Sequence, residues 1–328
     1  RFSDGAEDST RPAKLAAISP KLDALNAFKL PISGALEFTL NQNGSLTDRI
    51  SFDLAGGAGS LMVPKILPAP PNIASLRLQG DADANFDTLN LASLFIDTGG
   101  PTFNFSGQLS GISDQTAISG TFEFTEMPFD DLKNYWPDTL MTNARSWILG
   151  NVFDGVLSNF TVDFDIKPGE IDLVQSGARP NAIDVDFSFR DATVNYFPEQ
   201  PYAFGVDGEG HVDGASLSMN MRDGTIENMY APSGVALITD LMLDSAMLTI
   251  IANVEGPADN AISLLDGPRF GYPSKMGLKG EQFSGHVIAE MGVQLPFRSD
   301  VTFEEVQFAA VARLDDLNVR DLFGDYDV

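Results

Sequence analysis

The sequence contains no cysteine and only two histidines among its 328 residues. The absence of cysteine excludes disulfide bonds, thiol catalysis and cysteine-ligated metal sites. Neither His211 nor His286 belongs to a His-x-x-x-His pair, and no nucleophile motif accompanies either of them. The sequence therefore predicts no metal site, no cofactor and no catalytic residue, and we expect that the protein is not an enzyme.

Basic residues are also scarce. The 20 lysines and arginines stand against 46 aspartates and glutamates, which gives a formal net charge of −26 at pH 7. Nucleic acid is excluded as a partner because its binding depends on Lys and Arg side chains that neutralise phosphates. Anionic lipid surfaces are disfavoured for the same reason. We interpret the acidic residues as a solvated exterior; divalent-cation binding is the alternative, although no loop has the spacing of Ca²⁺ ligands.

Long apolar runs are missing too. No stretch reaches the roughly 18 apolar residues that span a bilayer, and the most apolar one, residues 235–254, contains Asp240 and Asp244. The first residues, Arg-Phe-Ser-Asp-Gly, do not have the pattern of a signal peptide. Because the sequence begins and ends abruptly, we expect it to be a piece of a longer protein.

The chain consists instead of short segments in which apolar and polar residues alternate, separated by turn signals such as Asn-Gln-Asn-Gly at residues 41–44. Alternation places the apolar side chains of a strand on one face. We therefore predict a mainly β protein, in which a long, twisted and curled antiparallel sheet forms a hydrophobic groove. The residues predicted to line this groove are Leu36, Phe38, Leu40, Ile50, Phe52, Leu54, Phe103, Phe105, Phe122, Phe124, Phe160, Val162, Phe164, Ile166, Val185, Phe187, Phe189, Leu217, Met219, Met221, Leu248, Ile250, Val287, Met291 and Val293.

A short helical insertion is predicted near the middle, at residues 128–155. Pro128 and Pro137 each stand where a helix can begin, and Gly150 is predicted as the residue that follows a helix. The apolar residues of this segment recur at helical spacing at Leu140, Ala144, Trp147 and Ile148. The insertion separates an N-terminal β segment (1–127), which has an irregular lead-in over about the first 30 residues, from a C-terminal one (156–328). Its helical plug is predicted to consist of Trp136, Trp147 and Ile148.

The side on which the apolar residues fall changes at residues 190–192, which predicts a turn or bulge there, and again near residues 304–305, which predicts a bulge. Glycines at 208, 210 and 214 have the wrong spacing for a phosphate-binding loop, and we interpret them as residues of a crowded, twisted sheet.

Rows of acidic residues such as Asp163 and Asp165 share one solvent-exposed face of a strand. They do not supply the opposed carboxylates of a glycosidase, so a hydrolase is the least favoured function.

Three stretches, in this order, resemble the AsmA-like proteins of the YhdP and TamB group. The first combines Tyr-Trp-Pro at 135–137 with Ala-Arg-Ser-Trp-Ile at 144–148, and Gly155 follows it. The second runs from Phe189 to Tyr196 and continues through Val-Asp-Gly at 206–208. The third combines Gly-Pro-Ala at 256–258 with Leu-Pro-Phe at 295–297. The resemblance covers about residues 125–320.

The resemblance implies a periplasmic bridge, anchored in the inner membrane, whose apolar trough carries phospholipid or another acyl-chain lipid between the inner and outer membranes. The family's N-terminal transmembrane helix is missing from this sequence, which agrees with a piece of a longer protein.

Two alternatives remain open from the residues alone. The apolar face either lines an open groove or is the core of a closed β-sandwich that serves as a structural or interaction module of the cell envelope. The helical plug either lies across the groove or covers a sheet edge.

Overall fold

The computed structural model describes residues 28–46, 49–61, 71–112, 115–138, 141–175, 180–197, 200–241, 243–267, 271–298 and 300–321. Most of the predicted lead-in, residues 1–27, lies outside these ranges, as does Leu140 of the predicted helix.

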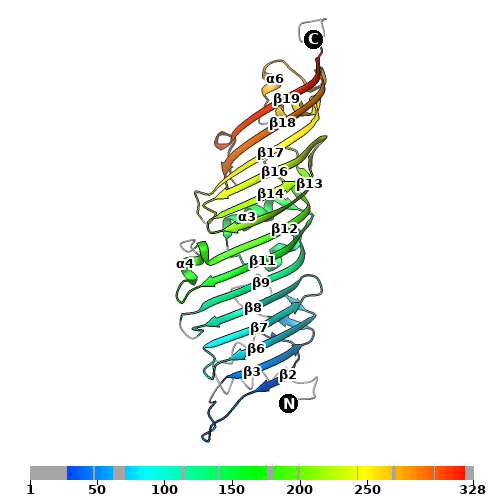
Figure 1. Cartoon of the computed structure of the whole chain (residues 1–328). Helices are drawn as coiled ribbons and strands as arrows, with labels where there is room; N and C mark the ends of the chain where they lie inside the picture. Colours follow the sequence, from blue (N-terminus) through cyan, green and yellow to red (C-terminus); the bar gives the residue numbers. More distant parts are fainter. Residues whose placement is uncertain are drawn as a thin grey trace. The chain divides into compact units, whose positions relative to one another are not determined.

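The structure confirms the predicted fold class, because 59% of it is strand and 15% is helix, and one large antiparallel sheet contains 16 strands (Figure 1). The strands are β1 (Phe28–Lys29), β2 (Ile32–Glu37), β3 (Ile50–Gly56), β4 (Gly59–Leu61), β5 (Asn72–Ile73), β6 (Ser75–Ala82), β7 (Thr88–Asp97), β8 (Thr102–Ser110), β9 (Ala117–Pro128), β10 (Val152–Phe153), β11 (Val156–Ile166), β12 (Ile183–Val194), β13 (Ala203–Asp213), β14 (Ser216–Arg222), β15 (Gly224–Ile226), β16 (Met229–Thr239), β17 (Met247–Pro257), β18 (Phe283–Pro296) and β19 (Gln307–Val319).

Neighbouring strands of the large sheet are mostly consecutive in the sequence. Its order is β2-β3-β6-β7-β8-β9-β11-β12-β13-β14-β16-β17-β18-β19, with β10 paired to β12 and β15 paired to β13 and β16. Strands β1, β4 and β5 form a separate small sheet. The turn signal at residues 41–44 is confirmed, since it lies between β2 and β3, which pair antiparallel as a hairpin with Leu36 opposite Phe52.

The helical elements are short. They are α2 (Leu132–Tyr135), α3 (Thr142–Asn151), α4 (Ile171–Gln175), α5 (Ala258–Leu265) and α6 (Tyr272–Lys275), with 3₁₀ turns at Phe129–Asp131, Pro180–Ala182, Gly280–Gln282 and Phe303–Glu305.

The boundaries of the central helix differ from the prediction at both ends. Trp136, which precedes a proline, has an extended backbone, as is usual for this position, and α3 begins at Thr142 rather than at Pro137. Gly150 lies inside α3 instead of following it. The helix ends where β10 begins to pair with β12, with Val152 opposite Val194, so strand pairing ends the helix rather than the glycine.

The two predicted register changes have different outcomes. In β12, Asp191 has a positive φ of 56°, and its N–H donates to the carboxylate of Asp207 at 2.8 Å. This residue moves the apolar side chains from odd to even positions, as predicted. The bulge predicted at residues 304–305 is wrong, because Glu304 and Glu305 belong to a 3₁₀ turn in the connection between β18 and β19. Hydrogen bonds from Thr302 to the Glu305 carboxylate favour this turn over a continued strand.

The chain divides into two compact units. The first comprises Arg1–Met127, Asp131–Met141 and Ser158–Asp186; the second comprises Pro128–Asp130, Thr142–Leu157 and Phe187–Val328. In the first unit, Leu30, Ile73 and Leu76 form a buried cluster.

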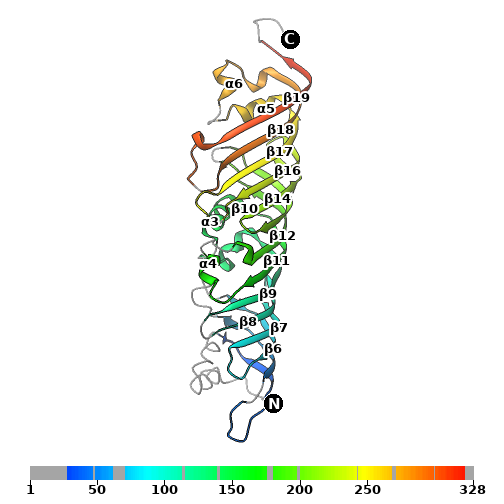
Figure 2. The ribbon, with the colours of Figure 1, turned by 60° about the vertical axis from the view of Figure 1, so that its left-hand side comes forward.

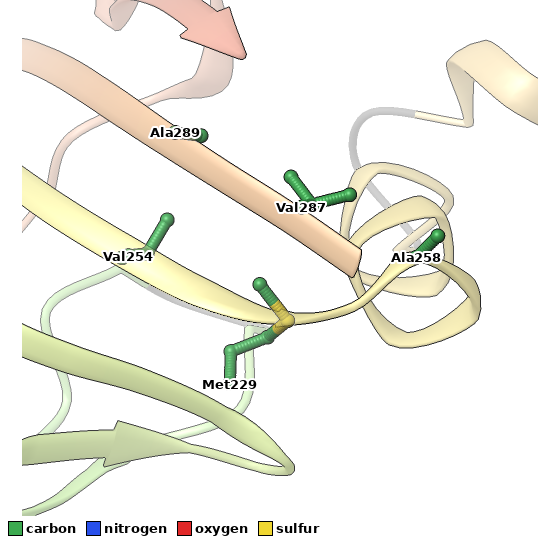
Figure 3. Close-up of a cluster of buried hydrophobic side chains, with 5 residues drawn as sticks. All are labelled: Met229, Val254, Ala258, Val287 and Ala289. Atoms are coloured by element: carbon green, nitrogen blue, oxygen red, sulfur yellow. The ribbon is translucent and has the colours of Figure 1, made fainter. Parts of the chain in front are cut away.

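In the second unit, α5 lies against the apolar face of β18 (Figure 2). Ala258 at the start of α5 belongs to a buried cluster with Met229, Val254, Val287 and Ala289, which come from β16, β17 and β18 (Figure 3). Burial of these side chains attaches α5 to the sheet, since removing apolar surface from water is the main favourable term in packing.

Two glycines of β13 make room for aromatic rings of β12. A Cβ atom on Gly210 would overlap the ring of Phe187, and one on Gly208 would overlap the ring of Phe189. The crowded sheet inferred from the sequence is therefore confirmed at these two positions. The rings of Phe187 and Phe189 lie 6.3 Å apart and are tilted by 35° relative to each other.

We predict that Gly210→Ala lowers the free energy of unfolding by about 1–3 kcal/mol, because the added methyl group forces the Phe187 ring out of its packed position. Urea denaturation followed by tryptophan fluorescence measures the change. Gly150→Ala is the control: no atom lies within 4 Å of its Cβ position, and alanine stabilises a helix interior by up to about 1 kcal/mol relative to glycine. Equal effects of the two substitutions would contradict the packing argument.

Candidate functional site

The apolar face of the sheet in the second unit lines a partly open cavity of about 190 Å³. Its wall is almost entirely apolar; the side chains with polar atoms are those of Trp147, Tyr196, Arg222 and Ser233. An apolar cavity of about 150 Å³ stays free of water, and it is large enough to bind a molecule such as benzene. The cavity can therefore accept an apolar ligand without breaking hydrogen bonds.

Eleven of the residues predicted to line a groove or form the plug lie in the wall of this cavity. They are Trp147, Ile148, Phe187, Phe189, Leu217, Met219, Met221, Leu248, Ile250, Met291 and Val293. Strand β14 illustrates why the alternation brings them together. Its residues Met219 and Met221 face the cavity, whereas Ser218 and Asn220 are exposed on the other side.

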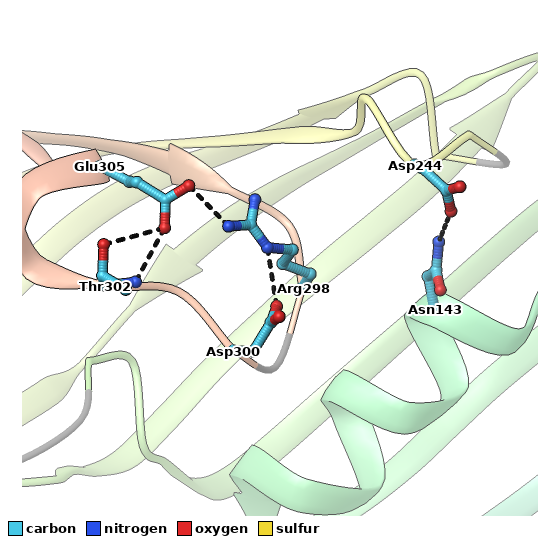
Figure 4. Close-up of polar contacts among 6 residues, drawn as sticks. All are labelled: Asn143, Asp244, Arg298, Asp300, Thr302 and Glu305. Atoms are coloured by element: carbon cyan, nitrogen blue, oxygen red, sulfur yellow. Dashed lines mark hydrogen bonds and ion pairs between the residues drawn. The ribbon is translucent and has the colours of Figure 1, made fainter.

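Helix α3 contributes Trp147 and Ile148 to the cavity wall. The Trp147 ring lies 5.2 Å from the ring of Phe297, measured between centroids. At the start of the helix, the side-chain amide of Asn143 donates to the Asp244 carboxylate at 3.4 Å (Figure 4). These contacts hold the helix on the apolar side of β16–β18. Trp136 of the predicted plug belongs to the first unit instead, where it follows α2.

A second cavity of about 130 Å³ lies beneath α5. Val287, another predicted groove residue, contributes to its wall. The two cavities share five lining residues: Tyr196, Ile226, Val254, Met291 and Val293. They therefore adjoin each other along the inner face of the same strands.

The remaining predicted residues belong to the first unit and do not line either cavity. Four of them form an aromatic cluster, in which the rings of Phe124 and Phe160 stack at 4.4 Å and Phe103 contacts Phe122 and Phe124. Ile50, Val162, Ile166 and Val185 are buried, and Phe52, Leu54, Phe105 and Phe164 are half-buried. Leu36, Phe38 and Leu40 are exposed by 42%, 51% and 52%, and the latter two lie beyond the end of β2.

Polar groups gather on the connection between β18 and β19 (Figure 4). The Arg298 guanidinium donates to Asp300 at 2.7 Å and to Glu305 at 2.6 Å. Two hydrogen bonds lower the pKa of Glu305 from 4.5 to about 2: the one from the Thr302 N–H has the larger effect, and the one from Arg298 comes next. Near the cavities, burial raises the pKa of Tyr196 to about 12, and the charge of Glu227 adds to this effect. The Tyr196 phenol therefore remains neutral at physiological pH.

Several cavity residues were missed by the sequence reasoning. They include the small residues Ala203, Ala231, Ala236 and Ala252, whose hydrophobic signal is weak. Ile238 was missed because β16 is apolar on both faces, with Val235 and Leu237 exposed by 47% and 43%. Pairing with β14, which places Leu217 opposite Ile238, is the signal that identifies its inner face.

Comparison with known proteins identifies the family. A model of the YhdP protein family matches residues 32–310, which is most of the chain. The chain belongs to the YhdP family. Membership of the YhdP family indicates an envelope protein related to lipid transport. Comparisons with curated proteins and with solved structures gave no significant match.

The described residues contain no helix that is both long enough and apolar enough to span a membrane.

We predict that stability depends on Glu305 at acid pH. A carboxylate whose folded pKa lies near 2 stabilises the fold fully above its ordinary pKa of 4.5, and this contribution is lost as the pH falls towards 2. Glu305→Gln should therefore flatten the decrease in melting temperature between pH 5 and pH 2, measured by circular dichroism, while Glu304→Gln removes an equal charge beside the network and serves as the control. Identical pH profiles for the wild type and Glu305→Gln would contradict this assignment.

Proposed function

We propose that this protein shields the acyl chains of phospholipid in the apolar cavities of its second unit, as a periplasmic segment of a longer, inner-membrane-anchored protein that carries lipid between the inner and outer membranes. The observation that supports this proposal is the continuous apolar lining along β12–β19, which includes the 190 Å³ and 130 Å³ cavities. Membership of the YhdP family points in the same direction.

The physical reason is the cost of exposing a lipid tail to water. Burying one methylene group lowers the free energy by about 0.8 kcal/mol. Moving a 16-carbon chain from an apolar environment into water therefore costs on the order of 12 kcal/mol. A protein surface that keeps the tail out of water needs no particular residue, only a continuous apolar lining. Met219, Met221 and Met291 suit this role because unbranched thioether side chains adapt to irregular ligands. The proposal requires no catalytic residue and no metal.

The position of α3 supports the first of the two readings of the helical plug. Trp147 and Ile148 lie in the cavity wall rather than at the edge of the sheet, so we assign α3 the role of closing the cavity over the lipid. Left-handed residues flank the segment that contains α3 and β10, with a φ of 52° at Met141 and 53° at Asp154.

A structural or interaction module of the envelope is the second candidate. It is favoured by the tight packing of α5, where Ala258 is 1% exposed and Met229 is 3% exposed. In that case the apolar face would be core, and the cavities would be packing defects.

The first test replaces an apolar cavity residue with a charged one. We predict that Met219→Glu reduces the phospholipid that copurifies with the gently extracted protein by at least about tenfold, because a carboxylate in an apolar cavity repels a hydrocarbon tail. Ser218→Glu, one residue along β14 on the exposed face, should retain wild-type lipid. Native mass spectrometry measures the bound lipid, and transfer of fluorescent phospholipid between vesicles measures the activity.

The melting temperatures of the two variants separate the two candidate functions. A partly open lipid-binding cavity should tolerate Met219→Glu with a small loss of stability, whereas a sealed core would unfold. Wild-type protein without bound phospholipid, together with an unfolded Met219→Glu variant, would refute lipid shielding and support the structural module.

The second test places a photoreactive amino acid in α3. Benzoylphenylalanine at Trp147 should crosslink to phospholipid in cells, because this side chain lies in the cavity wall. The same group at Ser146, which is exposed on α3, is the control and should give little or no lipid adduct. Crosslinking from Ser146 but not from Trp147 would place the lipid on the opposite side of α3.

A further inference from the structure

The two cavities of the second unit meet at a shared set of residues. Tyr196 follows β12, Ile226 ends β15, Val254 lies on β17, and Met291 and Val293 lie on β18; all five line both cavities. A residue that lines two cavities stands where one adjoins the other. These five residues are therefore the junction of the two cavities.

Each cavity has its own helical cover. Trp147 and Ile148 of α3 belong to the wall of the first cavity, whereas Ala261 and Leu264 of α5 belong to the wall of the second. No described residue of α3 lines the second cavity, and none of α5 lines the first. A ligand that extends through the junction is therefore covered by both helices.

The volumes of the cavities decide how a lipid tail can be seated. A cavity of about 150 Å³ binds benzene, which has six carbon atoms, so each carbon needs about 25 Å³. On this scale the 190 Å³ cavity takes about eight carbons and the 130 Å³ cavity about five. Neither cavity alone accommodates a tail of about 16 carbons, whereas the two together accommodate about 13 of them.

The junction permits the passage of an uncharged chain. Four of its five side chains are hydrocarbons or thioethers, and the fifth is the Tyr196 phenol. Burial is the main cause that raises the pKa of Tyr196 to about 12, so the phenol carries no charge at physiological pH. The described wall of the second cavity contains no lysine, arginine, aspartate or glutamate. A methylene chain therefore meets no charged side chain at the junction or in the cavity beneath α5.

We propose that a single acyl tail occupies both cavities in sequence, so that the second unit covers about 13 carbons of one tail. The inference rests on the proposed function and specifies the length of chain that the site recognises. The junction is where the tail passes from the cover of α3 to the cover of α5. Seating a separate tail in each cavity would leave at least about half of each 16-carbon chain outside it, which is the less favourable arrangement.

A series of single-chain lipids tests the inference. Lysophosphatidylcholines with saturated chains of about 8 to 18 carbons are offered in competing pairs below their critical micelle concentrations, and native mass spectrometry quantifies the bound lipid. Affinity for the wild-type protein should rise by about fourfold per added methylene group and level off near about 13 carbons. A plateau near about eight carbons would mean that the tail stops at the junction, and a rise that continues to about 18 would mean that it extends beyond both cavities. Either result would overturn the inference.

Substitutions assign the plateau to the junction. Ile226→Trp places a larger side chain there and should lower the plateau to about eight carbons. Thr225→Trp is the matched control, because Thr225 is exposed on the same strand and the variant should keep the wild-type plateau. If Ile226→Trp does not fold, Ala261→Phe, which fills only the second cavity from α5, should give the same lower plateau. A folded variant at either position that keeps the wild-type plateau would overturn the inference alone, whereas wild-type protein that binds no lysolipid of any length would overturn the proposed function together with it.

Discussion

The structure depends on the two-residue period of antiparallel strands. Hydrogen bonds between neighbouring strands fix the backbone, so successive side chains must point to opposite faces of the sheet. In this chain the alternation is maintained from strand to strand, as in β14, where Met219 and Met221 face inward and Ser218 and Asn220 face outward. One face is therefore apolar over many consecutive strands, and the lining of the cavities follows directly from this pattern.

Small residues and short helices then decide how much of that apolar face is filled. Gly208 and Gly210 leave space for the rings of Phe189 and Phe187. Alanines on β16 and β17 line the cavity, and their small side chains leave further space in it. Helices α3 and α5 cover part of the face, and the volume left between helices and sheet forms the two adjoining cavities. The cavities therefore form at inward-facing strand positions that carry small side chains.

The sequence was sufficient to predict the features that repeat, because strand alternation leaves a signal at every second residue. The fold class, the hairpin of β2 and β3 and the inward direction of Met219 and Leu248 all follow from it. The ends of α3 could not be predicted from local residues. Its start lies at Thr142, beyond Pro137 where a helix could have begun, and its end depends on pairing between Val152 and Val194, two positions far apart in the chain.

The candidate site shows the same division. Large apolar residues such as Phe187 and Ile250 were identified from their own positions, whereas Ala236 and Ile238 could be assigned to the cavity only through the register of neighbouring strands. Gln200, in the wall of the second cavity, was missed for a different reason. A glutamine in a turn normally faces water, and only its burial in the folded chain makes it notable.

The distribution of charge adds a constraint on how such a surface can work. The chain carries a net charge of −26, yet the only ionisable residues that contribute to the described cavity walls are Arg222 and Tyr196. Carboxylates are instead found on the opposite face of the same strands, where residues such as Glu209 on β13 and Glu290 on β18 are exposed. An acidic exterior is repelled by anionic membrane surfaces. Under the proposed function, the inner face therefore attracts lipid by apolar contact rather than by charge.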